Sequence, residues 1–276
     1  MTADPTDPLT EAFRAASSGE RIHDIGEAAL LMGALDRRGD DLGPYRAHLA
    51  EMAGLVQKHR EVEDAAGRGQ ILAGIIAQDF GYEGDADMFD NPHNSNLLGV
   101  IDRRAGVPVT LGILYLHLAR AAGWRAWGVA FPGQFLVSVE GEGGTSIIDP
   151  FDEGREMQTA DLYSLLHRMM GRMARLEENH LESVTDESVL IRVLSNVKAV
   201  AMRDKDYSRA IELLDRMLVI APGEAAFLFE QARLLNHDGH PTAAKRKYEA
   251  VIALDPKSPF AERSFEELAD INAKLN

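Results

Sequence analysis

The sequence is most informative at Pro108-Val-Thr-Leu-Gly-Ile-Leu-Tyr-Leu-His-Leu-Ala-Arg-Ala-Ala-Gly123. Proline suits the first turn of a helix and glycine commonly ends one, so this stretch predicts a helix over Val109–Ala122. Ile113 and Leu116 add apolar surface beyond the main apolar face, which holds Leu111, Leu114, Tyr115 and Leu118. A helix that is apolar on most sides is buried, so we expect this one to be the central helix of a domain.

Short runs with strand-like composition follow this helix. They cover Arg125–Ala130, Phe135–Val139 and Thr145–Ile148. The turn-forming Gly141-Glu-Gly-Gly144 separates the last two runs, as in a hairpin. We therefore predict a small antiparallel sheet packed on the central helix.

The residues before the central helix predict an all-helical front. Apolar residues recur three and four positions apart in Ile25–Arg37, Pro44–Arg60 and Ala66–Asp79. The chain then becomes rich in Gly, Asp and Asn over Gly81–Gly99, which predicts an extended loop. Loops of this kind often carry functional residues.

The tail repeats itself with a period of 34 residues. The repeat pairs Ala210 with Ala244, Leu214 with Tyr248, and Ala221-Pro222 with Asp255-Pro256. Small Ala where two helices approach, and Pro where the second helix ends, are typical of the tetratricopeptide family, which the tail resembles. We expect repeats over Ile191–Glu224 and Ala225–Ser258, followed by a capping helix over Pro259–Lys274.

The charge of the chain indicates two domains and excludes some classes of partner. Residues 183–276 hold 13 Lys and Arg against 15 Asp and Glu, so they carry −2 of the net charge of −15 and the first 182 residues carry −13. We expect domains at 1–182 and 183–276. Such an acidic chain is not expected to bind nucleic acid or an anionic membrane. Without a basic leader or a long apolar run, it is expected to be cytoplasmic.

Three phrases carry a further resemblance: Asn94–Leu111, Phe131-Pro-Gly-Gln-Phe-Leu-Val137 and Ile147-Ile-Asp-Pro-Phe-Asp-Glu-Gly154. They closely resemble the SirB-type family of bacterial transglutaminase-like, tetratricopeptide-repeat proteins, and the resemblance covers nearly the whole chain. It implies an α+β fold, in which a papain-like or transglutaminase-like domain precedes an α-helical repeat domain.

The resemblance also implies where catalytic residues would stand. In an active transglutaminase-like site, a Cys at the start of the central helix is the nucleophile, a His on the next strand is the base, and an Asp on the following strand orients the His. The nucleophile position falls within Pro108–Leu111, where Thr110 is the only hydroxyl, and the chain contains no Cys. Gln134 stands at the His position and Asp149 at the Asp position. Losing either the nucleophile or the base removes several powers of ten in rate, so no catalytic residue is predicted.

The former cleft still offers polar groups, and the ligand-binding candidates are Asn94, Ser95, Asn96, Thr110, Gln134 and Asp149. Each has an alternative structural role. Asp149 could orient a ligand, or it could accept hydrogen bonds from nearby backbone amides, as Asp before Pro commonly does. Gln134 could bind a ligand or satisfy a buried Asp149. The loop of Asn94–Asn96, with His93 before it, could meet a substrate or cap local turns.

Other polar residues are expected to be structural. His117 lies on the central helix and is predicted to be a satisfied core or boundary histidine rather than a base. Asp102-Arg103-Arg104 is predicted to form internal ion pairs that fix the loop. The nine His are scattered and no phosphate-cradling Gly-Lys motif is present, so neither a metal nor a cofactor is expected.

Three functions remain open at this point. The favoured one is a non-catalytic binding or adaptor protein, a pseudoenzyme whose repeats take a protein or peptide partner. The alternative is a residual amide hydrolase or transferase that uses Thr110 or an activated water. In the third, side chains fill the cleft and only the repeats bind. The sequence leaves the oligomeric state open.

Overall fold

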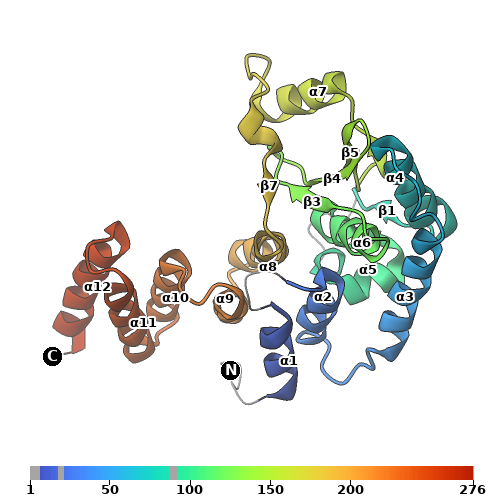
Figure 1. Cartoon of the computed structure of the whole chain (residues 1–276). Coiled ribbons are helices and arrows are strands. Elements are labelled where there is room, and N and C mark those ends of the chain that lie inside the picture. The colour runs from blue at the N-terminus through green and yellow to red at the C-terminus, as the bar shows by residue number, and fades with distance from the viewer. Residues whose placement is uncertain (1–6, 18–21, 87–91, 276) are drawn as a thin grey trace. The chain divides into compact units, whose positions relative to one another are not determined.

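The structure is a computed structural model that describes residues 7–17, 22–86 and 92–275 (Figure 1). It divides into two units. The larger unit is Ala15–Val193, and the smaller one joins the described residues of Met1–Arg14 to Leu194–Asn276. Each unit is described by itself below.

Helices form most of the larger unit, and polar residues start several of them. They are α2 (Ile25–Ala34), α3 (Gly43–Gln57), α4 (Ala65–Ala73), α5 (Leu97–Arg103), α6 (Pro108–Ala121) and α7 (Thr159–Met170), with parts of α1 (Pro8–Ser17) and α8 (Asp186–Arg203). Asp24 begins α2 by accepting from the backbone N–H groups of Gly26 and Glu27. Asp64 accepts from Gly67 N–H at the start of α4.

The sheet of the larger unit is antiparallel throughout and has the order β6-β5-β4-β3-β7. Its strands are β3 (Ala126–Val129), β4 (Leu136–Gly141), β5 (Gly144–Asp149), β6 (Arg155–Glu156) and β7 (Ser183–Val184). The hairpin of β4 and β5 closes where Gly141 pairs with Gly144. The predicted antiparallel sheet is therefore confirmed, with two short strands added at its edges. A separate parallel pair joins β1 (Glu83–Gly84) to β2 (Ala105–Gly106).

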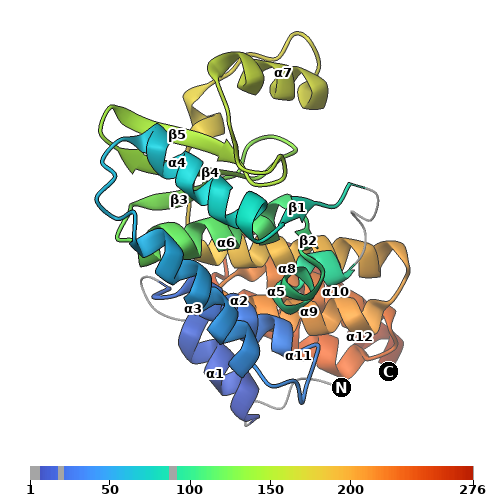
Figure 2. The ribbon, with the colours of Figure 1, turned by 90° about the vertical axis from the view of Figure 1, so that its right-hand side faces the viewer.

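Helix α6 is buried between the sheet and the helices α2 and α3 (Figures 1 and 2). Among its residues, Ile113, Leu114 and Leu116 are fully buried. Gly112 lets the helix approach the sheet closely, because a Cβ at this position would overlap the ring of Phe135. The predicted central helix is therefore confirmed, with its start at Pro108.

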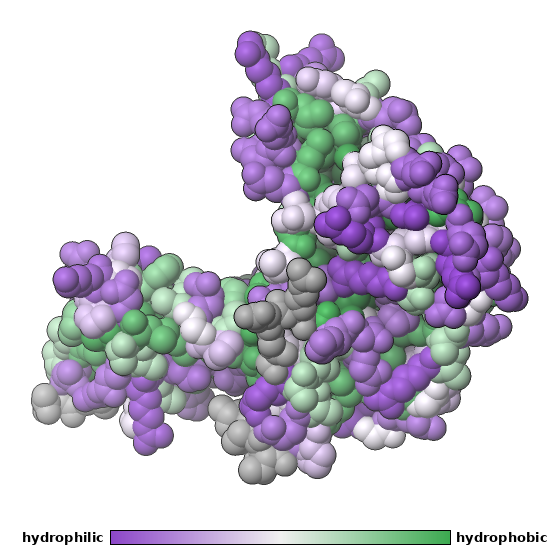
Figure 3. All heavy atoms as spheres, in the orientation of Figure 1, coloured by the Kyte–Doolittle hydropathy of each residue, from purple (hydrophilic) through white to green (hydrophobic). Residues whose placement is uncertain are grey.

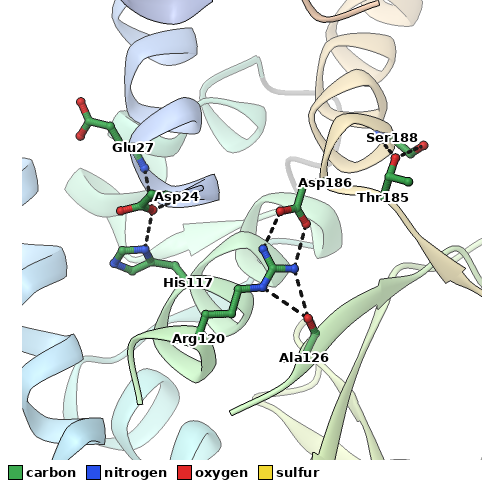
Figure 4. Close-up of polar contacts among 9 residues, drawn as sticks. Asp24, Glu27, His117, Arg120, Ala126, Thr185, Asp186 and Ser188 are labelled. Carbon is green, nitrogen blue, oxygen red and sulfur yellow. Dashed lines mark hydrogen bonds and ion pairs between the residues drawn. The ribbon is translucent and has the colours of Figure 1, made fainter. Parts of the chain in front are cut away.

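Arg120 ties the end of α6 to two other elements (Figure 4). Its guanidinium donates two hydrogen bonds to the carboxylate of Asp186, at 2.6 and 2.8 Å. It also donates to the carbonyl oxygen of Ala126 in β3, at 3.1 Å from Nη2. A bidentate pair of this kind holds both partners in a defined geometry, so α6, β3 and the first turn of α8 are positioned together.

The repeats form paired helices in the smaller unit. After α8 come α9 (Tyr207–Ile220), α10 (Ala225–His237), α11 (Pro241–Leu254) and α12 (Pro259–Leu275). Ala210 and Ala244, which the 34-residue period pairs, are both fully buried, and so are Leu214 and Tyr248. The predicted repeat architecture is confirmed, because small residues allow the helices to approach and bulky residues one turn later fill the interface.

Several elements differ from the sequence prediction. The predicted helix over Ala66–Asp79 changes to a π-helical turn over Gly74–Asp79. The predicted loop over Gly81–Gly99 contains β1 and, from Leu97, the start of α5. Helix α7 falls where no element was predicted. Helix α5 is short, so few apolar positions mark its period.

Replacing Gly112 with Ala should destabilise the protein by about 1–3 kcal/mol, because the buried ring of Phe135 cannot move away from the added methyl group. Urea unfolding would measure the change. Gly54→Ala in α3 is the matched control, since nothing lies within 4 Å of a Cβ there. We expect that control to gain about 0.5–1 kcal/mol, and equal effects at the two positions would contradict the close approach.

Candidate functional site

Asp149 lies at the end of β5 and is held there by two donors. Its side chain is only 6% exposed. Gln134 Nε2 donates to both carboxylate oxygens, at 3.1 and 3.3 Å, and the backbone N–H of Phe151 donates to Oδ1 at 2.9 Å. Burial raises the pKa of Asp149, and the hydrogen bonds from Gln134 and Phe151 oppose that rise. The structure therefore brings Gln134 and Asp149 together, as the resemblance implies.

The turn after Asp149 presses against α6. Gly154 N–H donates to the backbone oxygen of Asp149 at 2.9 Å, and Gly154 has a φ of +75°. A Cβ at Gly154 would lie 2.5 Å from the hydroxyl of Tyr115, which has no hydrogen-bond partner among the described residues. Burial raises the pKa of Tyr115 above its usual range, and the charges of Asp149 and Glu153 raise it further. A neutral phenol therefore lies beside the buried carboxylate.

Arg192 of α8 approaches Gln134 from another element. Its Nη2 donates to the backbone oxygen of Gln134 at 3.2 Å, and its guanidinium carbon lies 5.8 Å from the centre of the Phe135 ring. Burial lowers the pKa of Arg192. Within the described chain this guanidinium has no carboxylate partner, so it can still pair with an anionic group of a ligand.

Thr110 lies on the face of α6 opposite to the one that meets the sheet. At 100° per residue, Thr110 stands about 160° from Gly112, the residue that meets the sheet. It shares a stripe with His117, which lies two turns later and contacts α2. His117 Nδ1 is 2.8 Å from Asp24 Oδ1, and a Cβ at Gly26 would lie 2.6 Å from His117 Nδ1 (Figure 4). The hydroxyl of Thr110 is buried and has no partner in the described chain. Because Thr110 shares the face of His117, its side chain lies on the α2 side of the helix, away from Gln134 and Asp149.

Pro108 is the first-turn residue that shares a face with Gly112 and Tyr115, at spacings of four and seven residues. It therefore lies on the face of α6 that meets Phe135 and the turn at Gly154. This residue has no nucleophilic group. The four-residue spacing from Gly112 would have placed Pro108 on the sheet-facing side of α6, but the sequence does not show which face of the helix meets the sheet.

Asn94 and Asn96 stabilise the local fold through hydrogen bonds, and Ser95 is buried between them. Asn94 is fully buried; its side chain donates to Asp85 Oδ2 at 3.0 Å and accepts from Arg103. Asn96 begins α5 by accepting from Leu98 N–H at 3.0 Å. Ser95 is 7% exposed. The side chain of the neighbouring residue at position 93 lies outside the described residues.

The basic pair before α6 forms internal contacts, as the sequence predicts. Arg103 pairs with Asp85 at 2.6 Å, and Asp102 pairs with Arg37 at 2.6 Å. Arg104, at a φ of +59°, donates to His48 Nε2 at 2.6 Å. Burial lowers the pKa of His48, and the charge of Arg104 lowers it further. Both effects favour a neutral imidazole that accepts the bond from Arg104.

A surface pocket of about 540 Å³ lies beside these contacts. None of the predicted cleft residues lines it; the lining residues are Asp40, Asp41, Pro44, Tyr45, His48, Ile101, Asp102 and Arg104. Among the described residues, no three His, Asp or Glu side chains gather as metal ligands would. None of the described helices is long and apolar enough to cross a membrane.

Comparison with known families agrees with this arrangement. A family model described as the transglutaminase-like superfamily matches residues 44–195, more than half of the chain. The chain belongs to that superfamily. A model described as the tetratricopeptide repeat matches residues 197–268. The order of the two predicted domains is thereby confirmed, and the narrower SirB-type assignment stays a prediction.

Relatives of this transglutaminase-like chain occur in bacteria and in mammals. It is 28% identical to a UPF0162 protein of Xylella fastidiosa (strain 9a5c) over 186 residues, which are 66% of either chain. It is 29% identical to a UPF0162 protein of Vibrio cholerae over 217 residues, 78% of this chain and 79% of that one. It is also 26% identical to F-box only protein 21 of Mus musculus over 206 residues, which are 71% of this chain and 31% of the mouse protein.

Asp149→Asn should change how stability depends on pH. The folded pKa of Asp149 is raised above its unfolded value, so the folded state binds more protons and stability falls as pH rises from the unfolded pKa through the folded one. Asn does not ionise, so the variant does not lose stability in this way. Urea unfolding at about pH 4 and about pH 7 should therefore show that Asp149→Asn gains stability relative to the wild type at the higher pH. A difference between the two proteins that does not vary with pH would contradict this.

A thiol introduced on α6 should report which face meets Gln134. In Pro108→Cys, the added change Gln134→His should lower the thiol pKa from about 8.5 into the range of about 3.5–7.5, because an imidazolium stabilises a thiolate. The pH dependence of reaction with a small thiol reagent measures this pKa, and the chain has no other Cys. Thr110→Cys is the matched control and should show no shift when Gln134 is changed. A shift at Thr110→Cys alone would reverse the assignment of the two faces.

Proposed function

We propose that this protein is a non-catalytic binding protein, an adaptor whose transglutaminase-like cleft has become a ligand site and whose repeats hold a protein partner. The hydrogen bond from Gln134 to Asp149 supports this most strongly. At the place where an active relative needs a base, the chain presents an amide that donates to the carboxylate.

The chemistry of the site also supports a non-catalytic protein. A carboxamide does not accept a proton at neutral pH, so Gln134 is not a base. Pro108 offers no nucleophile, and the buried hydroxyl of Thr110 faces α2. An enzyme without either group lacks the parts of a triad that supply most of its rate enhancement.

The same residues are suited to binding. The Arg192 guanidinium and the amide of Gln134, both on partly exposed residues, can hydrogen-bond carboxylate and carbonyl groups. These groups fit a peptide segment with a free or side-chain carboxylate. Tetratricopeptide repeats generally mediate protein–protein interaction, so they supply a second binding surface.

A residual amide hydrolase or transferase is the second candidate. The observation that favours it is the raised pKa of Asp149, since a general base works best with a pKa near the working pH. Gln134 and the Phe151 amide already donate to that carboxylate, which opposes proton uptake.

Assays for peptide hydrolysis and amine transfer over a broad peptide set distinguish the two candidates. We expect the wild type to show no turnover above buffer, and Asp149→Ala and Gln134→Ala to behave in the same way. Turnover by the wild type that disappears in Asp149→Ala would overturn the proposal.

Photo-cross-linking tests the binding half. A benzoylphenylalanine at exposed Arg233 on α10 should capture a discrete partner in extract of the source cell, and the same group at exposed Arg60 after α3 should not. Identical capture at both positions would contradict a role for the repeats.

A further inference from the structure

Helix α7 and the segment after it expose an unusual concentration of apolar side chains. Six large apolar side chains are exposed in the described part of the chain, and four of them lie between residues 163 and 173. They are Tyr163 at 41%, Met169 at 53%, Met170 at 58% and Met173 at 93% exposure. We call residues 163–175 the methionine–arginine segment.

The segment is also basic. It contains Arg168, Arg172 and Arg175, and it contains no Asp or Glu. All three arginines are exposed, and none has an ion pair within the described residues. The chain as a whole carries −15, so this basic and apolar surface contrasts with the rest of the molecule.

The rest of the fold holds the segment in place. The inner face of α7 packs Leu162, Leu165 and Leu166 into a core cluster with Val129 of β3 and Phe131, which follows that strand. At the start of α7, Gln158 and Asp161 form a reciprocal capping box. The exposed methionines therefore lie on, or just after, a helix that its own buried face anchors. Figure 3 shows apolar and hydrophilic spheres interleaved over this part of the surface.

We propose that the methionine–arginine segment is a docking surface for an acidic, amphipathic helical segment of a partner protein. Methionine side chains are flexible and polarizable, and they adapt to apolar anchors of varied shape. The three unpaired guanidiniums complement carboxylates on either side of such anchors and steer the encounter. Met169 packs over Gly133, the residue before Gln134, so this surface borders the turn that carries Gln134. The proposal rests on the exposed methionine and arginine side chains and does not depend on the function of the cleft.

An anionic membrane is the less suitable occupant. Lipid-binding clusters commonly hold about four to eight Lys or Arg, and this segment holds fewer. An extended anionic surface also faces the negative charge of the rest of the chain, whereas a short acidic segment contacts only the basic segment. A second copy of this chain is the other occupant that the test must separate.

The absence of Cys allows a site-specific probe. Ser164→Cys places one thiol on the exposed side of α7, and an environment-sensitive fluorophore on it reports local binding. The ligands are synthetic helical peptides of about four turns: one with Glu and Leu on opposite faces, one with Glu and Ser, and one with Lys and Leu. We expect saturable binding of the Glu–Leu peptide only, weakened by salt because exposed charge pairs are screened.

Variants assign the binding to the segment. In the labelled protein, Met170→Ser with Met173→Ser should weaken binding of the Glu–Leu peptide at least about tenfold, because partial burial of two Met side chains is lost. Arg168→Glu with Arg172→Glu should weaken it as much and remove its salt dependence. Phe265→Ser, at another exposed apolar position, is the control and should leave binding unchanged.

Three results would overturn the proposal. One is Glu–Leu peptide binding that is the same in the double methionine variant. Another is a fluorophore response to vesicles with anionic lipid and not to any peptide. The third is a dimer of the wild type, seen by sedimentation, that the methionine changes abolish.

Discussion

The contact between Gly112 of α6 and the ring of Phe135 positions the rest of the larger unit. Because Gly112 has no side chain, the buried helix lies directly against the sheet. Gln134 comes just before Phe135, so the same contact places its amide near the first turns of α6. The hairpin register then brings Asp149, at the end of β5, within hydrogen-bond distance of Gln134. The geometry of a transglutaminase-like site is thus produced by packing, independently of whether its chemistry is present.

The residues of this site stabilise the fold through their hydrogen bonds. Asp149 accepts from Gln134 and from the Phe151 amide, which holds the turn that Tyr115 presses against. Asn96 accepts from the start of α5 and donates to Gly33 O of α2 at 3.0 Å. Residues that would surround a substrate in an active relative therefore carry hydrogen bonds that the fold needs. A buried polar group without such bonds would destabilise the folded state.

The sequence predicts elements whose side-chain period is long and uninterrupted. The central helix and the repeats around Ala210 and Ala244 have such periods, and their type and order could be read directly. The orientation of α6 could not be, because a helix that is apolar on all sides has no polar stripe to mark which face meets the sheet. Thr110 therefore looked like the nearest hydroxyl to the site although it faces α2. Helix α7 carries Leu162, Leu165 and Leu166 at helical spacing, so its sequence contains a signal that the prediction did not use.

Sulfur in this chain occurs only as thioether. With no thiol to react first, an oxidant such as peroxide meets Met170 and Met173, which are the most exposed methionines in the described chain. Conversion to the sulfoxide makes an apolar side chain polar, and sulfoxide reductases reverse the change. The surface of α7 would then lose its apolar character while the core beneath it stays intact, and the chain would respond to peroxide without forming any disulfide.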